Sequence, residues 1–298
     1  MKILVTGASG LVGRQLVPEL RKRGHTVNIL VRRKPKTPDE FYWNYRKREL
    51  DKGALEGVES IIHLAGATIG KKWTHEYKQE LISSRVDSAN FLFDRCTLAD
   101  LSLKSFISAS GINYYGTFTS DQILDEDSEI VKLDFLSDLC RKWESAALHF
   151  KTISNRTVIL RTAPVLSARG GTLEKLNMIT NLNLGSGIGK GTQWFNWVHL
   201  DDLVNMYVEA AENPKFNGNY NAVADEIPTN REFMRKLAEA RGKLFLPINV
   251  PAFLLKMILG EMSEIILEGT RVSNKKIKSR GFDFKYPELT QAFKALTT

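Results

Sequence analysis

The chain has little cysteine and no long apolar run. Of its 298 residues only Cys96 and Cys140 are cysteines, and their spacing fits neither a disulfide framework nor a CxxC pair. We therefore predict two buried thiols, and we expect no metal site. No apolar run reaches membrane-spanning length, and the first predicted strand begins at Lys2, so we expect neither a membrane span nor a signal peptide and place the protein in the cytoplasm.

Acidic residues are fewer than basic ones, and the formal net charge is +8. The cations are scattered in small clusters at Arg21–Arg23, Arg32–Lys36 and Arg46–Lys52, and no known nucleic-acid-binding module accompanies them. A solvated surface together with a phosphate site explains this charge, so we expect no nucleic-acid or membrane partner and a small-molecule substrate.

Strand and helix patterns alternate over about the first 160 residues, which predicts an α/β fold with a doubly wound parallel sheet of the Rossmann type. The predicted strands are 2–6, 26–31, 58–64, 103–110 and 156–161, the predicted helices are 11–24, 75–98 and 134–150, and a short pairing segment is expected around Phe41–Tyr45.

The rhythm changes after Arg161. A glycine-rich stretch at 184–191 leads to the aromatic segment 193–199, and a helix is predicted from about Asp201. Further helices are predicted near 229–241 and 251–258. We expect a dinucleotide-binding domain of residues 1–165, completed by about 190–225, and a smaller C-terminal lobe of 226–298 that makes a substrate cleft with it.

Residues 2–13 are the most informative stretch of the sequence. An apolar strand opens directly into Gly7, Gly10 and Gly13, and an amphipathic helix follows. In such a strand, turn and helix, the first glycine permits the tight turn, the second lets backbone N–H groups approach a pyrophosphate, and the third lets helix and strand pack closely. The expected cofactor contacts of this turn are Gly7, Ser9, Gly10, Leu11, Val12 and Gly13.

The second strand indicates which dinucleotide binds. NAD-binding chains usually carry an acidic residue near its end, but here Val31 is followed by Arg32 and Arg33. Asp39 and Glu40 come too late to fill that place. A guanidinium can pair with a 2′-phosphate, so these residues favour NADP(H). The alternative is a solvated basic turn.

An ordered set of motifs then carries a resemblance to a known family. The motifs are GASGLVG at 7–13, HLAG at 63–66, FISAS at 106–110 with YYG at 114–116, LRTAPVL at 160–166 and GKGTQWFNWVHLDD at 189–202. They resemble the extended short-chain dehydrogenase/reductase superfamily. The segments 71–85, 135–147 and 267–289 are more narrowly similar to the YfcH-type epimerase family, an atypical NADP-binding branch assigned as nucleoside-diphosphate-sugar epimerases.

The resemblance implies further roles. Leu64, Ala65 and Gly66 should lie against the adenosine or pyrophosphate, and Val165 against the carboxamide end of the cofactor. Glu80 and Arg85 resemble cofactor-facing residues, although an exposed helical face is the alternative for Glu80. The resemblance also suggests a homodimer formed through the helices at 75–98 and 134–150.

The sequence departs from the superfamily at its acid/base pair, a Tyr and a Lys four residues later. If Glu144 is matched to the superfamily's glutamate, Leu136 takes the Tyr place and Cys140 the Lys place. Neither can exchange a proton in that role. Lys142 is no substitute, because two residues rotate it about 200° around the helix axis.

The candidates that remain are Ser110, Tyr114 and Tyr115. Ser110 matches the superfamily's carbonyl-binding serine and could donate to a developing oxyanion, and a neighbouring tyrosine could then act as the acid. The alternative is that both tyrosines pack a loop. Cys140 is expected to be a buried apolar thiol, not a nucleophile.

A second departure concerns the substrate. Sugar-nucleotide enzymes of this superfamily commonly place an arginine where this chain has Phe195. Together with the apolar Leu136 and Cys140, this favours a compact, uncharged carbonyl compound, although Arg271 could supply a cation for a diphosphate. Of Trp194 and Trp197, strand alternation predicts that one faces the core. His199 is expected to be structural.

We therefore expect an NADP(H)-binding atypical extended short-chain reductase, an oxidoreductase or epimerase acting on a small carbonyl or alcohol. Two alternatives remain open. One is a non-catalytic NADP(H) sensor or binding protein, and the other is a nucleoside-diphosphate-sugar epimerase with a rewired acid/base.

Overall fold

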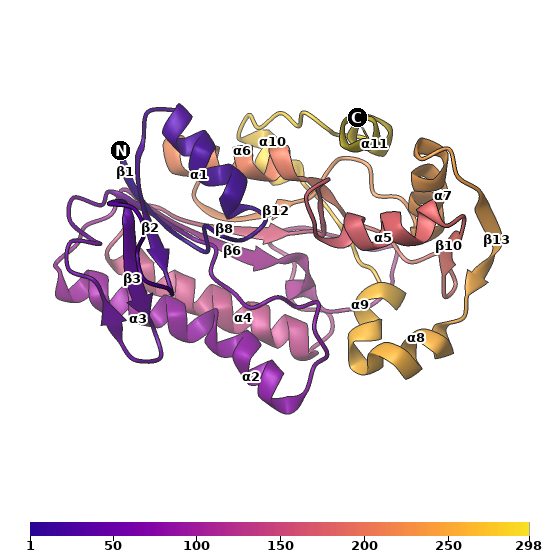
Figure 1. Ribbon diagram of the computed structural model, residues 1–298, viewed down its shortest axis with the longest axis horizontal. Coiled ribbons are helices and arrows are strands. Elements are labelled where there is room, and N and C mark those ends of the chain that lie inside the picture. Colours follow the sequence, from indigo (N-terminus) through magenta and orange to yellow (C-terminus); the bar gives the residue numbers. More distant parts are fainter. Residues whose placement is uncertain (298) are drawn as a thin grey trace. The chain divides into compact units, whose positions relative to one another are not determined.

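The computed structural model describes residues 1–297 and is built on a central eight-stranded sheet (Figure 1). Its strands are β1 (Lys2–Thr6), β2 (Thr26–Val31), β3 (Glu40–Asn44), β4 (Glu49–Leu50), β5 (Ser60–His63), β6 (Ser105–Gly111), β8 (Thr157–Thr162) and β12 (Gly218–Ala222). Their order is β12-β8-β6-β5-β1-β2-β3-β4. Strand β1 pairs in parallel with β2 and β5, as do β2 with β3 and β5 with β6. The predicted α/β fold with a parallel sheet is confirmed.

The strand order places a topological switch point between β1 and β5. The run β3-β2-β1-β5-β6-β8 is the order of a two-half dinucleotide-binding sheet, in which ligands bind outside the carboxyl ends of the strands at the switch point. Thr6 at the end of β1 is paired with His63 at the end of β5. The glycine turn and the HLAG segment therefore emerge side by side.

Helices cover both faces of this sheet. They are α1 (Gly13–Lys22), α2 (His75–Ser83), α3 (Val86–Leu98), α4 (Phe135–Leu148) and α6 (Leu200–Glu212). Figure 1 shows α1 and α6 on one face and α3 and α4 on the other. On α1 the buried residues include Leu16, Val17 and Leu20, the spacing expected from the sequence. Beneath the sheet, Phe106 and Phe150 stack in the core.

One predicted helix is two helices. The segment expected to be helical from 75 to 98 breaks between α2 and α3, at Ser84 and Arg85. The backbone N–H of Arg85 donates to Ile82, three residues back, so the regular ladder is interrupted there. The Ser84 hydroxyl meanwhile accepts the N–H of Ala67 at 2.9 Å. The break thus ties the helix to the HLAG loop.

Contacts divide the chain into two compact units whose segments interleave. The first unit contains residues 1–111, 138–161 and 204–220, and the second contains 112–137, 162–203 and the residues from 221 on. The domain ranges expected from the sequence, 1–165 completed by about 190–225 and then 226–298, stay a prediction.

The second unit contains shorter elements around its own core. They are β7 (Ile123–Leu124), β9 (Val165–Leu166), α5 (Thr172–Asn181), β10 (Gly185–Ile188), β11 (Val198–His199), α7 (Asn230–Ala240), β13 (Phe245–Val250), α8 (Ala252–Leu259), α9 (Glu264–Leu267), β14 (Arg271–Val272), α10 (Lys275–Ser279) and α11 (Leu289–Thr297). Strand β10 pairs with β13, β11 with β9, and β14 with β7. Trp197, Phe233 and Phe293 lie in the core of this unit.

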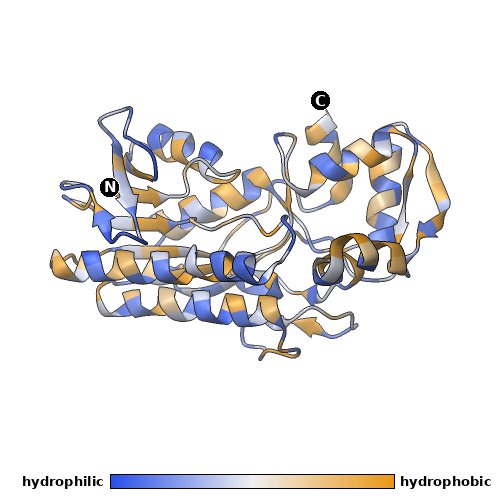
Figure 2. Cartoon of the chain, turned by 60° about the horizontal axis from the view of Figure 1, so that its bottom comes forward, coloured by the Kyte–Doolittle hydropathy of each residue, from blue (hydrophilic) through white to orange (hydrophobic). Residues whose placement is uncertain are grey.

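Helix α8 is apolar almost all round, as its hydropathy colouring in Figure 2 shows. Phe253, Met257 and Ile258 are largely exposed on it. No helix within residues 1–297 has both the length and the apolar character needed to cross a membrane.

Candidate functional site

The three glycines of the turn after β1 have different local surroundings. Gly7 has φ +71°, and a Cβ there would lie 2.7 Å from the backbone of Leu64. A Cβ on Gly13 would lie 2.5 Å from the Cα of Ala8. A Cβ on Gly10 would meet only the carbonyl oxygen of Gly7, at 3.2 Å. The first and third glycines thus serve the packing of the chain itself, and the middle one leaves room for a ligand.

The start of α1 suits an anion. Its first turn holds no acidic residue, and its N-cap, Val12, makes no side-chain cap hydrogen bond. The positive end of the helix dipole therefore lies beside Gly10. This cradle fits a dinucleotide pyrophosphate in shape and charge.

Thr6 and His63 hold the neighbouring loop, and the sequence reading did not single them out. The Thr6 hydroxyl accepts the N–H groups of Leu64 and Ala65, each at 3.1 Å, and lies 3.0 Å from the His63 ring. The other nitrogen of that ring is 3.2 Å from the Ser88 hydroxyl. Burial lowers the pKa of His63 to about 4, so the ring is neutral. The sequence signal that could have identified them is a polar residue at the end of each buried strand, Thr6 in β1 and His63 in β5.

Arg85 packs against this loop, and backbone carbonyls accept hydrogen bonds from its guanidinium. It is buried, donates to the carbonyl oxygens of Ala67 at 2.8 Å and Leu81 at 3.1 Å, and lies over the ring of Trp143. A Cβ on Gly66 would come within 3.0 Å of its guanidinium. The guanidinium is therefore held by backbone carbonyls, and the cofactor contact expected for Arg85 stays a prediction.

The two arginines after β2 are not equivalent. Arg33 makes a two-pronged pair with Glu40, at 2.8 and 2.6 Å. This pairing holds the pKa of Glu40 down to about 2. Arg32 is exposed and has no hydrogen-bond or ion-pair partner among residues 1–297. Glu40 thus occupies the guanidinium of Arg33 through the pairing of β2 with β3, and Arg32 remains available.

Glu80 pairs with a neighbouring cation. Its carboxylate forms an ion pair with Arg46, within a surface hollow that also includes Gln79, Ser83 and Asp87. This contact agrees with the exposed-helix alternative. Its expected cofactor contact stays untested.

Ser110, at the end of β6, donates a hydrogen bond to the carboxylate of a buried ion pair. Its hydroxyl donates to Glu144 at 2.8 Å, and Glu144 also accepts two hydrogen bonds from Arg161, both at 2.9 Å. All three side chains are buried. A carboxylate paired with arginine only accepts, so the serine proton points toward it. In this arrangement Ser110 offers a ligand lone pairs and not a donor, contrary to the expected oxyanion role.

The two positions matched to the superfamily's Tyr and Lys lie on α4. Leu136 and Cys140 are both buried there. Burial and the nearby Glu144 carboxylate raise the pKa of Cys140 to about 12, which agrees with the expected unreactive thiol. Lys142 is half-buried and pairs with Asp138 at 2.6 Å.

The two tyrosines differ in burial. Tyr115 is fully buried, and its hydroxyl donates to Asn221 at 2.9 Å. This arrangement agrees with the alternative that Tyr115 packs the loop. It argues against Tyr115 as an acid, because its O–H already donates a hydrogen bond to Asn221. Tyr114 is half-buried and lies edge-on to Tyr115, with ring centroids 5.5 Å apart.

Val165 and His199 lie on paired strands of the second unit. Val165 is opposite Val198, and His199 is opposite Leu166. Burial lowers the pKa of His199 to about 4, and its Nδ1 accepts the N–H of Asp201 at 3.1 Å. This neutral, hydrogen-bonded ring agrees with the structural role expected for His199.

The aromatic segment alternates as a strand would. Trp197 is fully buried and donates to the Glu226 carbonyl, and Phe195 packs on Phe233 with centroids 4.0 Å apart. Trp194 is half-buried instead, with the Arg271 guanidinium 4.6 Å above its ring. Phe195 therefore packs against the core of the second unit, and Trp197 is the tryptophan that faces this core, as strand alternation predicted.

Metal-binding geometry is not found in this part of the chain. Within residues 1–297 no group of three or more His, Cys, Asp or Glu side chains could hold a metal ion.

A parallel sheet with a switch point, a glycine turn at that point and an open anion cradle define a Rossmann-type dinucleotide-binding protein. The comparisons agree. Residues 3–223 match the model of the NAD dependent epimerase/dehydratase family, and 250–296 match a domain of unknown function, DUF1731. The chain belongs to this family, as an atypical extended short-chain dehydrogenase/reductase with a nicotinamide-dinucleotide-binding fold.

Two curated relatives and one solved structure are similar to nearly all of this chain. An epimerase family protein of Staphylococcus aureus is 33% identical over 298 residues, covering 98% of both chains. The chloroplastic SDR39U1 homolog of Arabidopsis thaliana is 33% identical, covering 99% of this chain and 86% of the relative. The crystal structure of human epimerase family protein SDR39U1 with NADPH is 29% identical, covers 99% of both chains and has a TM-score of 0.89.

Proposed function

We propose that the protein is an NADP(H)-dependent oxidoreductase that acts on a small carbonyl or alcohol compound. The observation that carries the proposal is Arg32, an unpartnered guanidinium where an NAD-binding chain would hold the ribose hydroxyls with a carboxylate. The solved human relative, which contains NADPH, supports the same choice.

When bound, the nicotinamide supplies the hydride. The chain's own part is to hold the dinucleotide, with the room beside Gly10 for the pyrophosphate and Arg32 for the 2′-phosphate. Ser110 can accept a hydrogen bond from a substrate alcohol while its own O–H donates to Glu144. Tyr114 is the remaining candidate for proton exchange, and Tyr114→Phe with Tyr115→Phe as its buried control tests that role.

The experiment compares Arg32→Ala with Arg33→Ala by quenching of tryptophan fluorescence. We expect the unmodified chain to bind NADPH at least about tenfold more tightly than NADH, a difference of about 1.4 kcal/mol. Arg32→Ala should remove most of that preference and leave NADH binding unchanged. Arg33→Ala should retain it, because Glu40 already occupies that guanidinium. Equal affinities for the two cofactors in the unmodified chain would refute the proposal.

A second candidate is an NADP(H)-binding protein without turnover. It is favoured by the hydroxyl groups of Ser110 and Tyr115, which already donate hydrogen bonds within the protein. It is also favoured by the buried Leu136 and Cys140 at the positions matched to the superfamily's Tyr and Lys. NADPH oxidation, followed at saturating cofactor with a panel of carbonyl compounds, distinguishes the two. Tight NADPH binding with no oxidation by any member of the panel favours this second candidate.

A further inference from the structure

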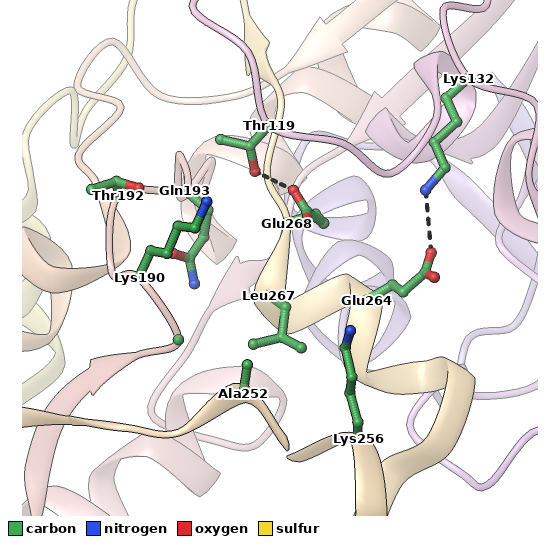
Figure 3. Close-up of a pocket in the computed structure, with 11 residues that line it drawn as sticks. Thr119, Lys132, Lys190, Thr192, Gln193, Ala252, Lys256, Glu264, Leu267 and Glu268 are labelled. Atoms are coloured by element: carbon green, nitrogen blue, oxygen red, sulfur yellow. Dashed lines mark hydrogen bonds and ion pairs between the residues drawn. The ribbon is translucent and has the colours of Figure 1, made fainter. Parts of the chain in front are cut away.

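The second unit contains a pocket of about 430 Å³, which is within the size range of small-molecule sites. Three segments form its walls: 119–132, the glycine-rich turn at 189–193, and 252–268. The last wall lies in the region that matches the domain of unknown function. Figure 3 shows its lining residues, which are Thr119, Lys132, Gly189, Lys190, Thr192, Gln193, Ala252, Lys256, Glu264, Leu267 and Glu268.

Hydrogen bonds fix these walls to one another. The side-chain amide of the buried Gln193 donates to the carbonyl oxygens of Ile188 at 3.1 Å and Ile266 at 2.9 Å. Asn249 donates to the carbonyl oxygen of Gly189 at 3.0 Å. A Cβ on Gly189 would already lie 3.0 Å from Leu267, so the turn and the third wall are in close contact. The pocket is built from fixed backbone.

The turn presents Lys190 to this pocket. Lys190 lies between Gly189 and Gly191, whose φ angles are +58° and +75°, and the N–H of Gly191 donates to Ile188 at 2.9 Å. Such positive φ angles are readily adopted by glycine, which explains why glycine stands at both of these positions.

The charges in the pocket do not cancel. Lys132 pairs with Glu264 at 3.4 Å, and Glu268 accepts the Thr119 hydroxyl, as the dashed lines in Figure 3 show. Within residues 1–297, the ammonium groups of Lys190 and Lys256 have no hydrogen-bond or ion-pair partner. Three lysines and two glutamates leave a formal charge of +1 on the lining. Two unpaired ammonium groups, from two different walls, thus line the same pocket.

We propose that this pocket binds the carboxylate or phosphate group of a small hydroxylated compound, with Lys190 and Lys256 as the cations that select it. A bound anion would pair with the two ammonium groups, and Glu268 and Thr192 would meet its hydroxyl groups. This inference rests on the proposed function in taking the bound compound to be the substrate. It replaces the uncharged compound expected from Phe195, because Phe195 packs in the core and the cation is supplied five residues earlier, at Lys190.

The test uses the full chain saturated with NADPH, so that the dinucleotide site is closed to anionic probes. Titration calorimetry compares gluconate, glucose 6-phosphate and neutral glucose, and the two anionic arms separate a carboxylate from a phosphate preference. We expect one anionic probe to bind and glucose not to bind. Lys190→Gln and Lys256→Gln should each weaken that binding about tenfold. Lys175→Gln, an exposed lysine on α5 outside the pocket, is the matched control and should change nothing.

The proposal is overturned if neither anionic probe binds better than glucose, or if both pocket variants bind it as tightly as the control. NADPH affinity and NADPH oxidation are measured in every variant. Anion binding that depends on Lys190, without oxidation of NADPH by any carbonyl compound, leaves the pocket assignment standing and refutes the proposed oxidoreductase. Oxidation with neutral compounds and no anion binding refutes only the pocket assignment.

Discussion

The hydroxyl of Ser110 shows how one hydrogen bond decides what a residue can do. A hydroxyl has a single proton to donate in a hydrogen bond, and here Glu144 accepts that bond while Arg161 donates to the same carboxylate. The same serine without this carboxylate would be free to donate to a substrate oxygen. The role of Ser110 therefore depends on a neighbour 34 residues away.

Ser110→Ala tests this role. The substitution removes one of the buried donors to Glu144, so we expect the free energy of unfolding to fall by about 1–3 kcal/mol. Turnover, if present, should fall by less than the factor of about 10²–10³ that follows loss of an oxyanion donor. Urea unfolding and steady-state kinetics measure the two effects. A loss of that larger size with unchanged stability would restore the donor role.

His63 gives the protein a predicted pH dependence. Burial lowers its pKa from 6.5 to about 4, so the unfolded chain binds the proton that the folded chain excludes. This contribution to stability is present above pH 6.5 and is lost as the pH falls toward 4; it amounts to about 3 kcal/mol. Unfolding free energies measured from pH 7 to 4 should show this decline, and it should be shallower in His63→Asn. An unchanged slope in that variant would assign the decline to other groups.

At the scale of elements, the glycines of the turn after β1 have two different roles. Gly13 is needed for the packing of the chain, and Gly10 leaves room for a ligand. Gly13→Ala should destabilise the apo chain, because its Cβ would lie 2.5 Å from the Cα of Ala8. Gly10→Ala should change apo stability little, since its Cβ meets only one atom at 3.2 Å, but should abolish thermal stabilisation by NADPH. Thermal melts with and without NADPH compare the two. Full stabilisation of Gly10→Ala by NADPH would place the pyrophosphate elsewhere.

Periodicity located β1, β2, β5, β6 and β8 to within a few residues, because apolar strands such as β1 are buried and show this locally. It did not predict the edge strands β4 and β12. It could not locate the break at Ser84 and Arg85, which depends on contacts with Ala67. It could not separate Arg32 from Arg33 either. Their difference comes from the pairing of β2 with β3, which brings Glu40 beside Arg33. Such differences depend on contacts formed in the folded protein, which the spacing of residues along the sequence does not reveal.

At the scale of the whole molecule, the first unit is completed late in the chain. The guanidinium of Arg156, just before β8, donates to the carbonyl oxygens of Ala210, Ala211 and Phe216, at 2.9, 3.0 and 2.7 Å. In the same segment, Glu212 accepts from Arg23 and pairs with His25. Residues 204–220 are therefore part of the nucleotide-binding unit.

A fragment of residues 1–165, the expected nucleotide-binding domain, tests this organisation. We expect it to be insoluble or partly unfolded, because it leaves Arg156 without its three acceptors and β8 without its neighbour β12. The full chain is the control. Circular dichroism and NADPH binding measure the outcome, and a folded fragment with full NADPH affinity would contradict it.

The late completion of the first unit also sets an order in time during synthesis. After Arg161 leaves the ribosome, 59 residues must follow before Tyr220 closes the unit, as 220 minus 161 gives. At about 5–20 residues per second this takes about 3–12 s, far longer than secondary structure needs to form. During that interval the outer edge of β8 is unpaired, and the nascent chain is then most exposed to pairing with another strand and most in need of a chaperone.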